Sequence, residues 1–369
     1  MINTKAAIVE QPGASFTVQD VMLDEPRSGE VLVRMVAAGL CHTDLGVQAG
    51  GIPFRLPGIL GHEGAGVVEA VGSAVTKVTA GDKVLLSFTS CGACGACRGG
   101  HPAYCDTWVP RNLIAGARDD GSATVYRDGQ AIGGRFFGQS SFARHAIADE
   151  RSVVKVADDA PLDVLAPLGC GVQTGFGTVW NILSPAPAST LAVFGAGAVG
   201  LAAVLAAALL PLEAVIAIDI VPARLDLARE LGATHTVNAQ AQDAAAIIAE
   251  ITGGRGADYS IDTTAVPAVV RTAVDALAIR GTCAIIGAPP QGTEVAFEVQ
   301  SLLPGKHVTG VTLGDAEPET LIPQLVSLHR DGRLPLEKLI THYRLGELDA
   351  AARDMHRGVT IKPVIVFHD

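Results

Sequence analysis

The sequence has few aromatic residues and no excess of positive charge. Phe, Trp and Tyr make up 4% of its 369 residues, and 38 Asp and Glu outnumber 27 Lys and Arg, which gives a net charge of -11. Partners such as nucleic acid or an anionic membrane select for a basic surface, so this balance argues against both. The negative charge favours solubility instead.

The sequence also lacks an apolar run long enough for an export signal or a membrane span. The N-terminal segment is soon interrupted by Glu10, Pro12 and Gly13, and the most apolar stretch, Leu201 to Leu212, is too short to cross a bilayer. We therefore expect a cytoplasmic protein. In that reducing compartment, clustered cysteines are more often metal ligands than disulfides.

Length and composition predict a globular protein of two domains. With 369 residues, 49% of them hydrophobic and 18% charged, the chain is too long for one small core and too apolar to be disordered. Up to about residue 160, β-branched segments alternate with Gly, Pro and Asp, which favours a mainly β domain. From about residue 172, apolar strands alternate with helices, which is typical of a doubly wound parallel sheet. The predicted fold class is therefore α/β.

The expected elements follow this division. We expect strands at 5–9, 30–36, 64–71 and 83–86, and then at 190–195, 214–219, 257–262 and 281–287. Helices are expected at 198–210, 223–231 and 266–278, and a last strand at 361–367. The stretch 108–138 has weak periodicity, so we expect a long loop over the surface there.

A glycine-rich turn stands between the expected strand at 190–195 and the next helix. Gly195, Gly197 and Gly200 form a G-x-G-x-x-G sequence, which permits a tight turn, close approach of a pyrophosphate, and close packing of helix and strand. The helix N-terminus adds free N–H groups for the phosphates. The motif alone is weak in a chain with 42 glycines, but its place between strand and helix strengthens it.

Asp219 ends the next expected strand, where an acid can accept hydrogen bonds from an adenosine ribose. An acid at this position repels a 2′-phosphate, so we expect NAD rather than NADP. Arg224 leaves the alternative open, because its charge can contact a ribose hydroxyl or, if Asp219 turns away, a 2′-phosphate. The sequence thus predicts a dinucleotide site and favours NAD.

Four of the seven cysteines lie within a single short run. They are spaced C-x2-C-x2-C-x7-C, at Cys91, Cys94, Cys97 and Cys105. Four thiolates from one loop are typical of a closed structural zinc site. An iron–sulfur cluster is the rival, but ferredoxin runs place the fourth cysteine three residues on and follow it with Pro, whereas Asp106 follows here. Zinc is therefore favoured.

The remaining cysteines are scattered. Cys41 and Cys170 lie far from the run, with His62 between them in the sequence. Ligands that mix Cys with His from distant segments are typical of a catalytic zinc with one open position. Cys283 lies in an expected apolar strand, and we expect it to be a core residue.

Four motifs, in this order and spacing, resemble the zinc-dependent alcohol dehydrogenases of the medium-chain dehydrogenase/reductase superfamily. They are Gly39-Leu-Cys-His-Thr-Asp44, Gly61-His-Glu-Gly-Ala-Gly66, the cysteine run and the glycine-rich turn. The insertion that ends in Gly138-Gln-Ser-Ser-Phe-Ala143 is most similar to bacterial aryl-alcohol (benzyl-alcohol) dehydrogenases. The resemblance implies a GroES-like, mainly β catalytic domain over 1–171 and 313–369, and a Rossmann NAD-binding domain over 172–312.

The resemblance also implies metal-site roles. It assigns a catalytic zinc to Cys41, His62 and Cys170, and a structural zinc to Cys91, Cys94, Cys97 and Cys105. Glu63 would lie behind the catalytic zinc and coordinate it transiently, Asp44 would orient the His62 ring, and Thr43 would take the alcohol proton towards the cofactor ribose. Gly46 stands where liver-type members have a histidine as outer base, so no outer base is assigned.

Cofactor and substrate contacts are implied in the same way. His42 and Lys362 match positions that contact cofactor phosphates, and Thr174 is a further expected cofactor contact. The substrate pocket is expected between the zinc and the nicotinamide, in the cleft between the domains, with Ile52, Phe136, Phe137 and Ala288 in its wall. Aromatic side chains opposite a small Ala288 suit a flat ring or a branched allylic chain better than ethanol.

The resulting hypothesis is a zinc- and NAD-dependent enzyme that reversibly oxidises an aryl or allylic primary alcohol to its aldehyde. One alternative keeps this chemistry but takes aliphatic alcohols, polyols or a thiol adduct of formaldehyde. Another is a metal- and nucleotide-binding redox sensor without turnover, which the complete set of Cys41, His62 and Cys170 opposes. The resemblance further implies a homodimer or homotetramer joined through the nucleotide-binding domains.

Overall fold

The computed structural model describes residues 1–367, which divide into two compact units. The first unit comprises residues 1–170 together with those from 317 onward, and the second comprises residues 171–316. The predicted second domain, 172–312, differs from this unit by one residue at its start and four at its end.

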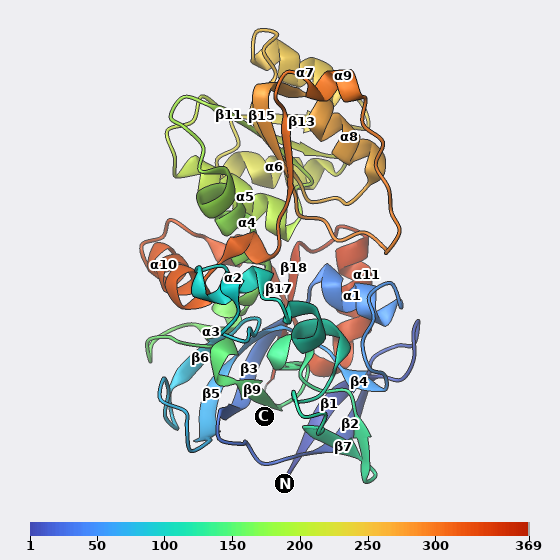
Figure 1. Cartoon of the computed structure of the whole chain (residues 1–369), viewed down its shortest axis with the longest axis vertical. Helices are drawn as coiled ribbons and strands as arrows, with labels where there is room; N and C mark the ends of the chain where they lie inside the picture. The colour runs from blue at the N-terminus through green and yellow to red at the C-terminus, as the bar shows by residue number, and fades with distance from the viewer. Residues whose placement is uncertain (368–369) are drawn as a thin grey trace. The chain divides into compact units, whose positions relative to one another are not determined.

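A seven-stranded sheet runs through the first unit (Figure 1). Its order is β10-β6-β5-β3-β18-β17, and β9 also pairs with β3. The strands are β3 (Glu30–Gly39), β5 (Glu63–Val71), β6 (Lys83–Leu86), β9 (His145–Asp149), β10 (Val153–Lys155), β17 (Ile340–Arg344) and β18 (Lys362–Val366). Buried valines of β3, β5 and β6, such as Val33, Val68 and Val84, fill one core of this unit.

A five-stranded sheet of order β4-β1-β2-β7-β8 lies in the same unit. Its strands are β1 (Ile2–Val9), β2 (Thr17–Leu23), β4 (Gly58–Ile59), β7 (Val125–Arg127) and β8 (Gln130–Ile132). The helices of this unit are α1 (His42–Gln48), α2 (Gly95–Arg98), α3 (Leu162–Leu165), α10 (Pro318–Arg330) and α11 (Leu348–His356). The short segment between β4 of this sheet and β5 of the seven-stranded sheet carries Gly61 and His62, so these two residues lie where the chain passes from one sheet to the other.

The second unit contains a six-stranded parallel sheet of order β13-β12-β11-β14-β15-β16. Its strands are β11 (Thr190–Phe194), β12 (Ala214–Asp219), β13 (His235–Asn238), β14 (Ala257–Asp262), β15 (Leu277–Ile285) and β16 (His307–Gly310). Its helices are α4 (Gly171–Gly177), α5 (Ala198–Ala208), α6 (Pro222–Glu230), α7 (Ala244–Ile251), α8 (Pro267–Asp275) and α9 (Val299–Leu302).

Helices cover both faces of this parallel sheet. On one face, Ile248 of α7 and Val274 of α8 share a core with Ile216 of β12. The other face belongs to α5, because a Cβ added at Gly200 would lie 3.4 Å from the Val193 side chain, which points away from that core. This arrangement confirms the predicted doubly wound sheet. Among the described residues, no helix has the length and apolar character needed to cross a membrane.

The prediction of a surface loop over 108–138 is wrong. This stretch contains a π-helical turn at Pro110–Ile114 and the β7–β8 hairpin, and both Arg118 and Arg135 are buried within it. Arg118 forms two hydrogen bonds of 2.9 Å to the Glu30 carboxylate, and Arg135 also pairs with Glu30. Buried charges are tolerated here because they are paired with each other. Since these buried residues are charged rather than apolar, the sequence shows no apolar periodicity that would indicate burial.

Candidate metal centres and cofactor-binding loop

Three distant segments of the first unit bring four potential ligands together. One ligand atom from each of Cys41, His62, Glu63 and Cys170 lies within 4.8 Å of the others. Cys41 is the residue before α1, His62 precedes β5, and Cys170 follows the 3₁₀ turn Ala166–Gly169. The three residues that we predicted to bind one metal, Cys41, His62 and Cys170, all lie in this cluster.

Asp44 organises two of these ligands from behind. Its carboxylate is fully buried and accepts hydrogen bonds from Cys41 N at 2.9 Å, Gly61 N at 3.0 Å and His62 Nδ1 at 3.0 Å. The bond to Nδ1 fixes the plane of the His62 ring and directs Nε2 away from Asp44. A carboxylate behind a histidine in this way is a common support for a metal ligand.

The free nitrogen of His62 fits a metal. Within the described part of the chain, His62 Nε2 is buried and has no hydrogen-bond partner, which is costly for a polar atom unless something else binds it. Burial alone lowers the pKa of His62, but the Asp44 carboxylate and the neighbouring Cys41 thiolate together more than offset this and raise that pKa to about 10. A metal would therefore displace a proton from Nε2, and two thiolates with one neutral imidazole suit zinc.

Glu63 forms a buried ion pair beside these ligands. Lys362 Nζ lies 2.9 Å from both Glu63 carboxylate oxygens and donates to Leu40 O at 3.1 Å. Burial alone lowers the pKa of Lys362, but the pairing with Glu63 raises it, so the ammonium stays charged. Because these bonds occupy the ammonium, the expected contact with a cofactor phosphate would require one of them to break.

The remaining predicted residues on α1 lie next to Cys41. His42 is exposed at the start of the helix, and Thr43 Oγ1 lies 3.7 Å from Cys41 Sγ. Ile52 packs against Gly46, since a Cβ added to this glycine would lie 2.8 Å from Ile52 Cδ1. A larger side chain at 46 would therefore displace Ile52.

Two phenylalanines enclose the His62 ring. Phe137 stacks on it with centroids 4.3 Å apart, and Phe136 meets it edge-on at 5.4 Å. Both are buried, and Phe137 takes a left-handed backbone conformation with φ of 51°. Ala288, the fourth predicted pocket residue, lies in the second unit and is exposed.

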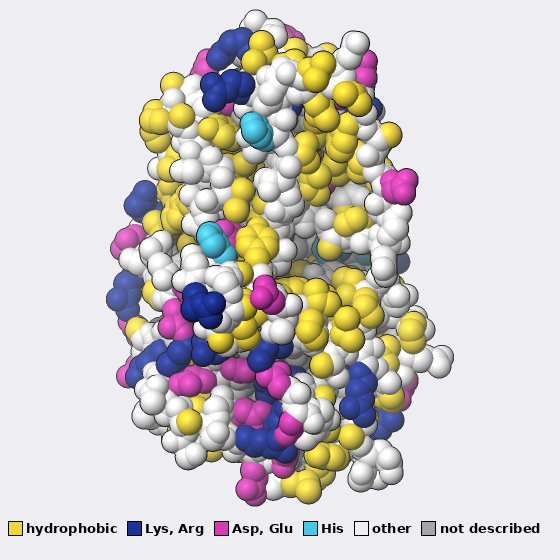
Figure 2. All heavy atoms as spheres, viewed as in Figure 1, with side chains coloured by type: hydrophobic (Ala, Val, Ile, Leu, Met, Phe, Trp, Pro, Cys, Tyr) yellow, Lys and Arg dark blue, Asp and Glu magenta, His cyan; other side chains and the backbone are white. Residues whose placement is uncertain are grey.

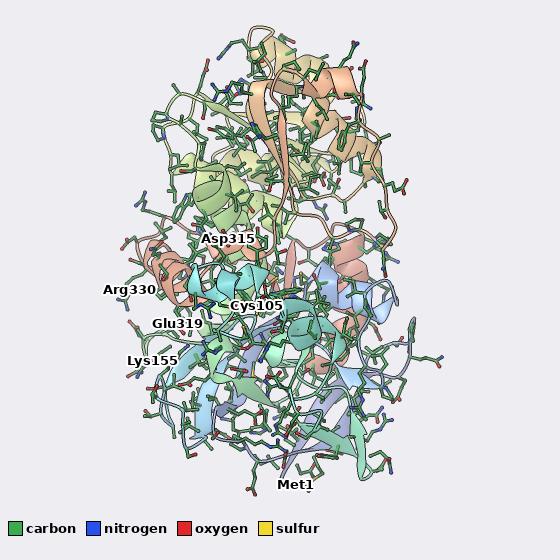
Figure 3. All side chains as sticks on the ribbon, in the orientation of Figure 1. Met1, Cys105, Lys155, Asp315, Glu319 and Arg330 are labelled. Carbon is green, nitrogen blue, oxygen red and sulfur yellow. The ribbon has the colours of Figure 1, made fainter. Side chains whose placement is uncertain are left out.

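The four-cysteine run forms a second cluster, which includes Cys105 (Figure 3). The sulfur atoms of Cys91, Cys94, Cys97 and Cys105 all lie within 4.8 Å of one another, and those of Cys91 and Cys97 are 3.9 Å apart. Zn–S bonds of about 2.3 Å place the sulfurs of a tetrahedral site about 3.8 Å apart, so the cluster fits zinc. Backbone N–H groups of Cys94 and Cys97 donate to sulfur at 3.3 and 3.5 Å. These bonds favour thiolates.

The glycine-rich turn of the second unit leaves room for a phosphate. Gly195 has φ of +92°, and a Cβ at Gly200 would lie 1.8 Å from Gly195 O, so both positions require glycine. At Gly197, the residue before α5, an added Cβ would meet no described atom within 4 Å. This open space lies at the N-terminus of an eleven-residue helix, where the first N–H groups lack helical partners.

Asp219 and Arg224 lie beside this turn. Asp219 is buried and accepts hydrogen bonds from Ala196 N at 2.6 Å, Ile220 N at 2.7 Å and Val221 N at 2.8 Å. Arg224 Nη1 lies 3.9 Å from Asp219, and its Nε is buried without a hydrogen-bond partner among residues 1–367. Thr174 is buried on α4. The three backbone bonds resist rotation of the Asp219 carboxylate.

Two family models match the chain, one in each half. Residues 27–158 match the alcohol dehydrogenase GroES-like domain, and residues 198–328 match the zinc-binding dehydrogenase domain. Geraniol dehydrogenase from Castellaniella defragrans is 43% identical, with 99% of this chain and 98% of that protein covered. The chain belongs to the zinc-dependent alcohol dehydrogenases of the medium-chain superfamily.

Two solved structures of similar proteins support the same placement. A zinc-binding alcohol dehydrogenase domain protein from Burkholderia ambifaria has a TM-score of 0.97 and 47% identity, with 100% of both chains covered. Benzyl alcohol dehydrogenase from Acinetobacter calcoaceticus has a TM-score of 0.96 and 43% identity over the same coverage. The predicted GroES-like and Rossmann fold class and the resemblance to benzyl-alcohol dehydrogenases are thereby confirmed.

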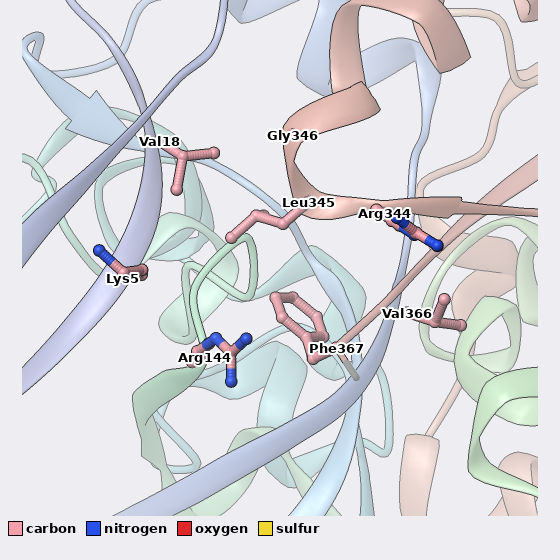
Figure 4. A pocket seen from close by; sticks show the side chains of 8 residues that line it. All are labelled: Lys5, Val18, Arg144, Arg344, Leu345, Gly346, Val366 and Phe367. Carbon is pink, nitrogen blue, oxygen red and sulfur yellow. The ribbon is translucent and has the colours of Figure 1, made fainter. Parts of the chain in front are cut away.

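This alcohol dehydrogenase also has a cavity of about 450 Å³ elsewhere in its first unit (Figure 4). Lys5, Arg144 and Arg344 line it together with apolar residues such as Phe367. None of the predicted site residues lines this cavity. It therefore does not belong to the metal site.

Sequence reasoning missed one residue at the metal site of this dehydrogenase. Gln139 is 1% exposed and hydrogen-bonds the backbone on both sides of Glu63, at His62 O and Gly64 N. In the sequence it stands between a glycine and two serines, where a polar residue suggests an ordinary loop. No local pattern indicates its burial.

Proposed function

We propose that this alcohol dehydrogenase oxidises aryl or allylic primary alcohols to aldehydes with NAD as hydride acceptor, and that the reaction is reversible. The observation that carries the proposal is the buried, unpartnered Nε2 of His62 beside Cys41 and Cys170, within the described chain. The mixed ligand set is one that holds a catalytic zinc with an open position. The four-thiolate cluster would hold a second, structural zinc.

Zinc bound to Cys41, His62 and Cys170 would lower the pKa of an alcohol hydroxyl and polarise an aldehyde oxygen. The chain's own residues would orient the metal ligands and exclude water from them. Asp44 holds the His62 ring by its Nδ1 bond, and Phe136 and Phe137 shield that ring from water. The Thr43 hydroxyl, 3.7 Å from Cys41 Sγ, would accept the alcohol proton.

The phenylalanines also support the substrate class. Phe136 and Phe137 pack two aromatic rings against His62 at the proposed metal site, and aromatic surroundings favour a flat ring or an allylic chain over a small aliphatic alcohol. Two similar proteins are a geraniol dehydrogenase and a benzyl alcohol dehydrogenase. For the cofactor, the backbone-fixed Asp219 favours NAD over NADP.

The first experiment is a kinetic panel on purified protein. Formation of NADH or NADPH is followed with benzyl, cinnamyl, geranyl and simple aliphatic alcohols, each with NAD⁺ and with NADP⁺. We expect the highest kcat/KM for the aryl or allylic alcohols with NAD⁺. If none of the alcohols is oxidised, the proposal is refuted. A clear preference for NADP⁺ would refute the cofactor assignment.

Thr43 is tested by a matched pair of variants. Thr43→Ser keeps the hydroxyl and Thr43→Val keeps the shape. We expect Thr43→Ser to retain turnover and Thr43→Val to lose about 100-fold or more in kcat, the usual contribution of a positioned proton-transfer group. Equal pH–rate profiles for the two variants would contradict this role.

We also propose a homodimer or homotetramer that forms through the second unit and works in the cytoplasm. β16 is the last strand at one edge of the parallel sheet, and Ile279, Val299 and Leu303 near it are more than 70% exposed. Figure 2 shows apolar side chains gathered over this part of the unit. An exposed strand edge with apolar neighbours is suited to pairing with a second copy. Seven free thiols favour a reducing compartment.

A further inference from the structure

The side chain of Gln139 connects two strands at the proposed catalytic metal site. Its Oε1 accepts from Gly64 N at 3.0 Å, and its Nε2 donates to His62 O at 3.0 Å and to Ser87 O at 2.8 Å. The side chain is buried, and the amide uses both of its hydrogens and its oxygen in these bonds. One amide group therefore joins the backbone around His62 to the end of β6.

The Gln139 amide takes the place of backbone hydrogen bonds that would extend the pairing of β5 with β6. Strands β5 and β6 pair from Val67 opposite Lys83 to Ala65 opposite Leu85. Continuing that register would bring Glu63 opposite Ser87, which is the level at which the Gln139 amide lies between the two backbones. A Cβ at Gly64 would lie 2.8 Å from Gln139 Oε1, so this glycine makes the close approach possible.

The connection extends to the third ligand. Ser87 Oγ donates to Gly169 O at 2.7 Å, and both residues are buried. Gly169 immediately precedes Cys170, whose backbone N in turn bonds Pro167 O at 3.4 Å. A continuous path of hydrogen bonds and backbone thus runs from His62 through Gln139 and Ser87 to Cys170.

We propose that Gln139 is a positioning residue that sets the separation of His62 and Cys170, and through it the coordination geometry of the catalytic metal. The inference rests on the proposed function, because it presupposes a metal at Cys41, His62 and Cys170. Asp44 fixes the His62 ring, and Gln139 fixes the His62 backbone. The two residues act on different parts of the same ligand.

The test uses isosteric variants of the full-length protein loaded with cobalt, whose absorption bands report coordination geometry. Gln139→Met keeps the side-chain size but removes all three hydrogen bonds. Asn112→Leu is the matched control, because Asn112 is an equally buried amide that bonds Thr89 N, Thr89 O and Trp108 O, each at 2.9 Å. The bands lost in Cys170→Ser identify the His62 site.

A milder pair of variants tests the next connection in the path. Ser87→Ala removes only the hydroxyl that donates to Gly169 O. Ser141→Ala is its control, since the buried Ser141 Oγ has no hydrogen-bond partner in residues 1–367. This pair decides the question if Gln139→Met does not fold.

We expect Gln139→Met to shift the cobalt bands of the His62 site and to weaken metal retention against a chelator about 10–100-fold, the usual effect of removing a group that orients a ligand. Ser87→Ala should shift the same bands to a smaller degree, while both controls match the wild type. Wild-type bands and retention in Gln139→Met, or wild-type bands in Ser87→Ala when Gln139→Met does not fold, would overturn this inference alone. A wild-type protein with no bands that depend on Cys170 would overturn the proposed function and this inference with it.

Discussion

Asp44→Asn is the substitution that most directly tests the site around His62. Three donors converge on the two Asp44 oxygens: Cys41 N, Gly61 N and His62 Nδ1. An amide has only one oxygen, so at least one of these donors would face the new NH₂ group. Because the carboxylate is fully buried, water cannot replace the lost bond.

The expected magnitude follows from that one unpaired donor. A buried donor left without an acceptor costs about 1–3 kcal/mol. Loss of a residue that orients a metal ligand lowers metal affinity about 10–100-fold, which corresponds to about 1.4–2.8 kcal/mol. The first cost falls on the free energy of unfolding and the second on metal binding, so we expect Asp44→Asn to be less stable by about 1–3 kcal/mol and to lose zinc from this site at about 10–100-fold lower chelator strength than the wild type.

The assay measures zinc per chain after dialysis against a graded series of chelators. Asp258→Asn is the control, because the Asp258 carboxylate accepts from Thr190 N and Thr190 Oγ1, both at 2.9 Å, in the second unit. We expect the control to lose stability without losing zinc. Wild-type zinc retention in Asp44→Asn would refute the reasoning that Asp44 supports the metal ligands.

Three further predictions concern the rest of the first unit. Cys97→Ser should reduce the zinc content from two ions per chain to one by metal analysis, and an unchanged content would contradict a structural zinc at the four-cysteine cluster. Arg118→Met should lower the free energy of unfolding by about 3–5 kcal/mol in urea, because it leaves the buried Glu30 carboxylate with one partner fewer. Arg330→Met, which breaks an exposed pair of 3.0 Å with Asp159 on the surface near α10 (Figure 3), should cost less than about 1 kcal/mol. Burial is the largest single effect on Glu30 and raises its pKa, but the hydrogen bonds from Arg118 and the Arg27 backbone, together with the charges of Arg135 and Arg118, outweigh it and lower the net pKa. The pair therefore stabilises the fold above the unfolded-state pKa of about 4.3, and this stability should be lost as pH falls below it and should be absent in Glu30→Gln. Equal acid sensitivity of Glu30→Gln and the wild type would contradict this.

The second unit could be predicted from sequence because its signals are local. The expected strands at 214–219 and 257–262 coincide with β12 and β14, and the expected helix at 198–210 differs from α5 only at its end. A strand buried on both faces is a continuous apolar run, and glycines mark the turn that follows it. Shorter elements, such as β13 and α7, were missed, because they contain too few residues for a periodic pattern.

The metal site could be predicted only in part. Residue type and spacing indicate Cys41, His62 and Cys170, because few side chains bind zinc. The supports of these ligands depend on contacts that no spacing shows. Lys362 meets Glu63 across 299 positions, and Gln139 meets His62 across 77. The stretch 108–138 was mistaken for a surface loop because its burial relies on paired charges.

The pairing of β18 with β3 has a consequence for how the protein is made. Val364 lies opposite Gly39, and the Lys362 ammonium reaches Glu63 only when this pair has formed. On the ribosome, β3 and His62 emerge early, but β18 follows only after all of residues 171–316 have been translated. The first unit therefore begins to fold before the second unit but is completed after it. Until then, Glu63 does not have Lys362 as its ion-pair partner. Zinc that enters earlier would meet the three ligands beside an unneutralised carboxylate.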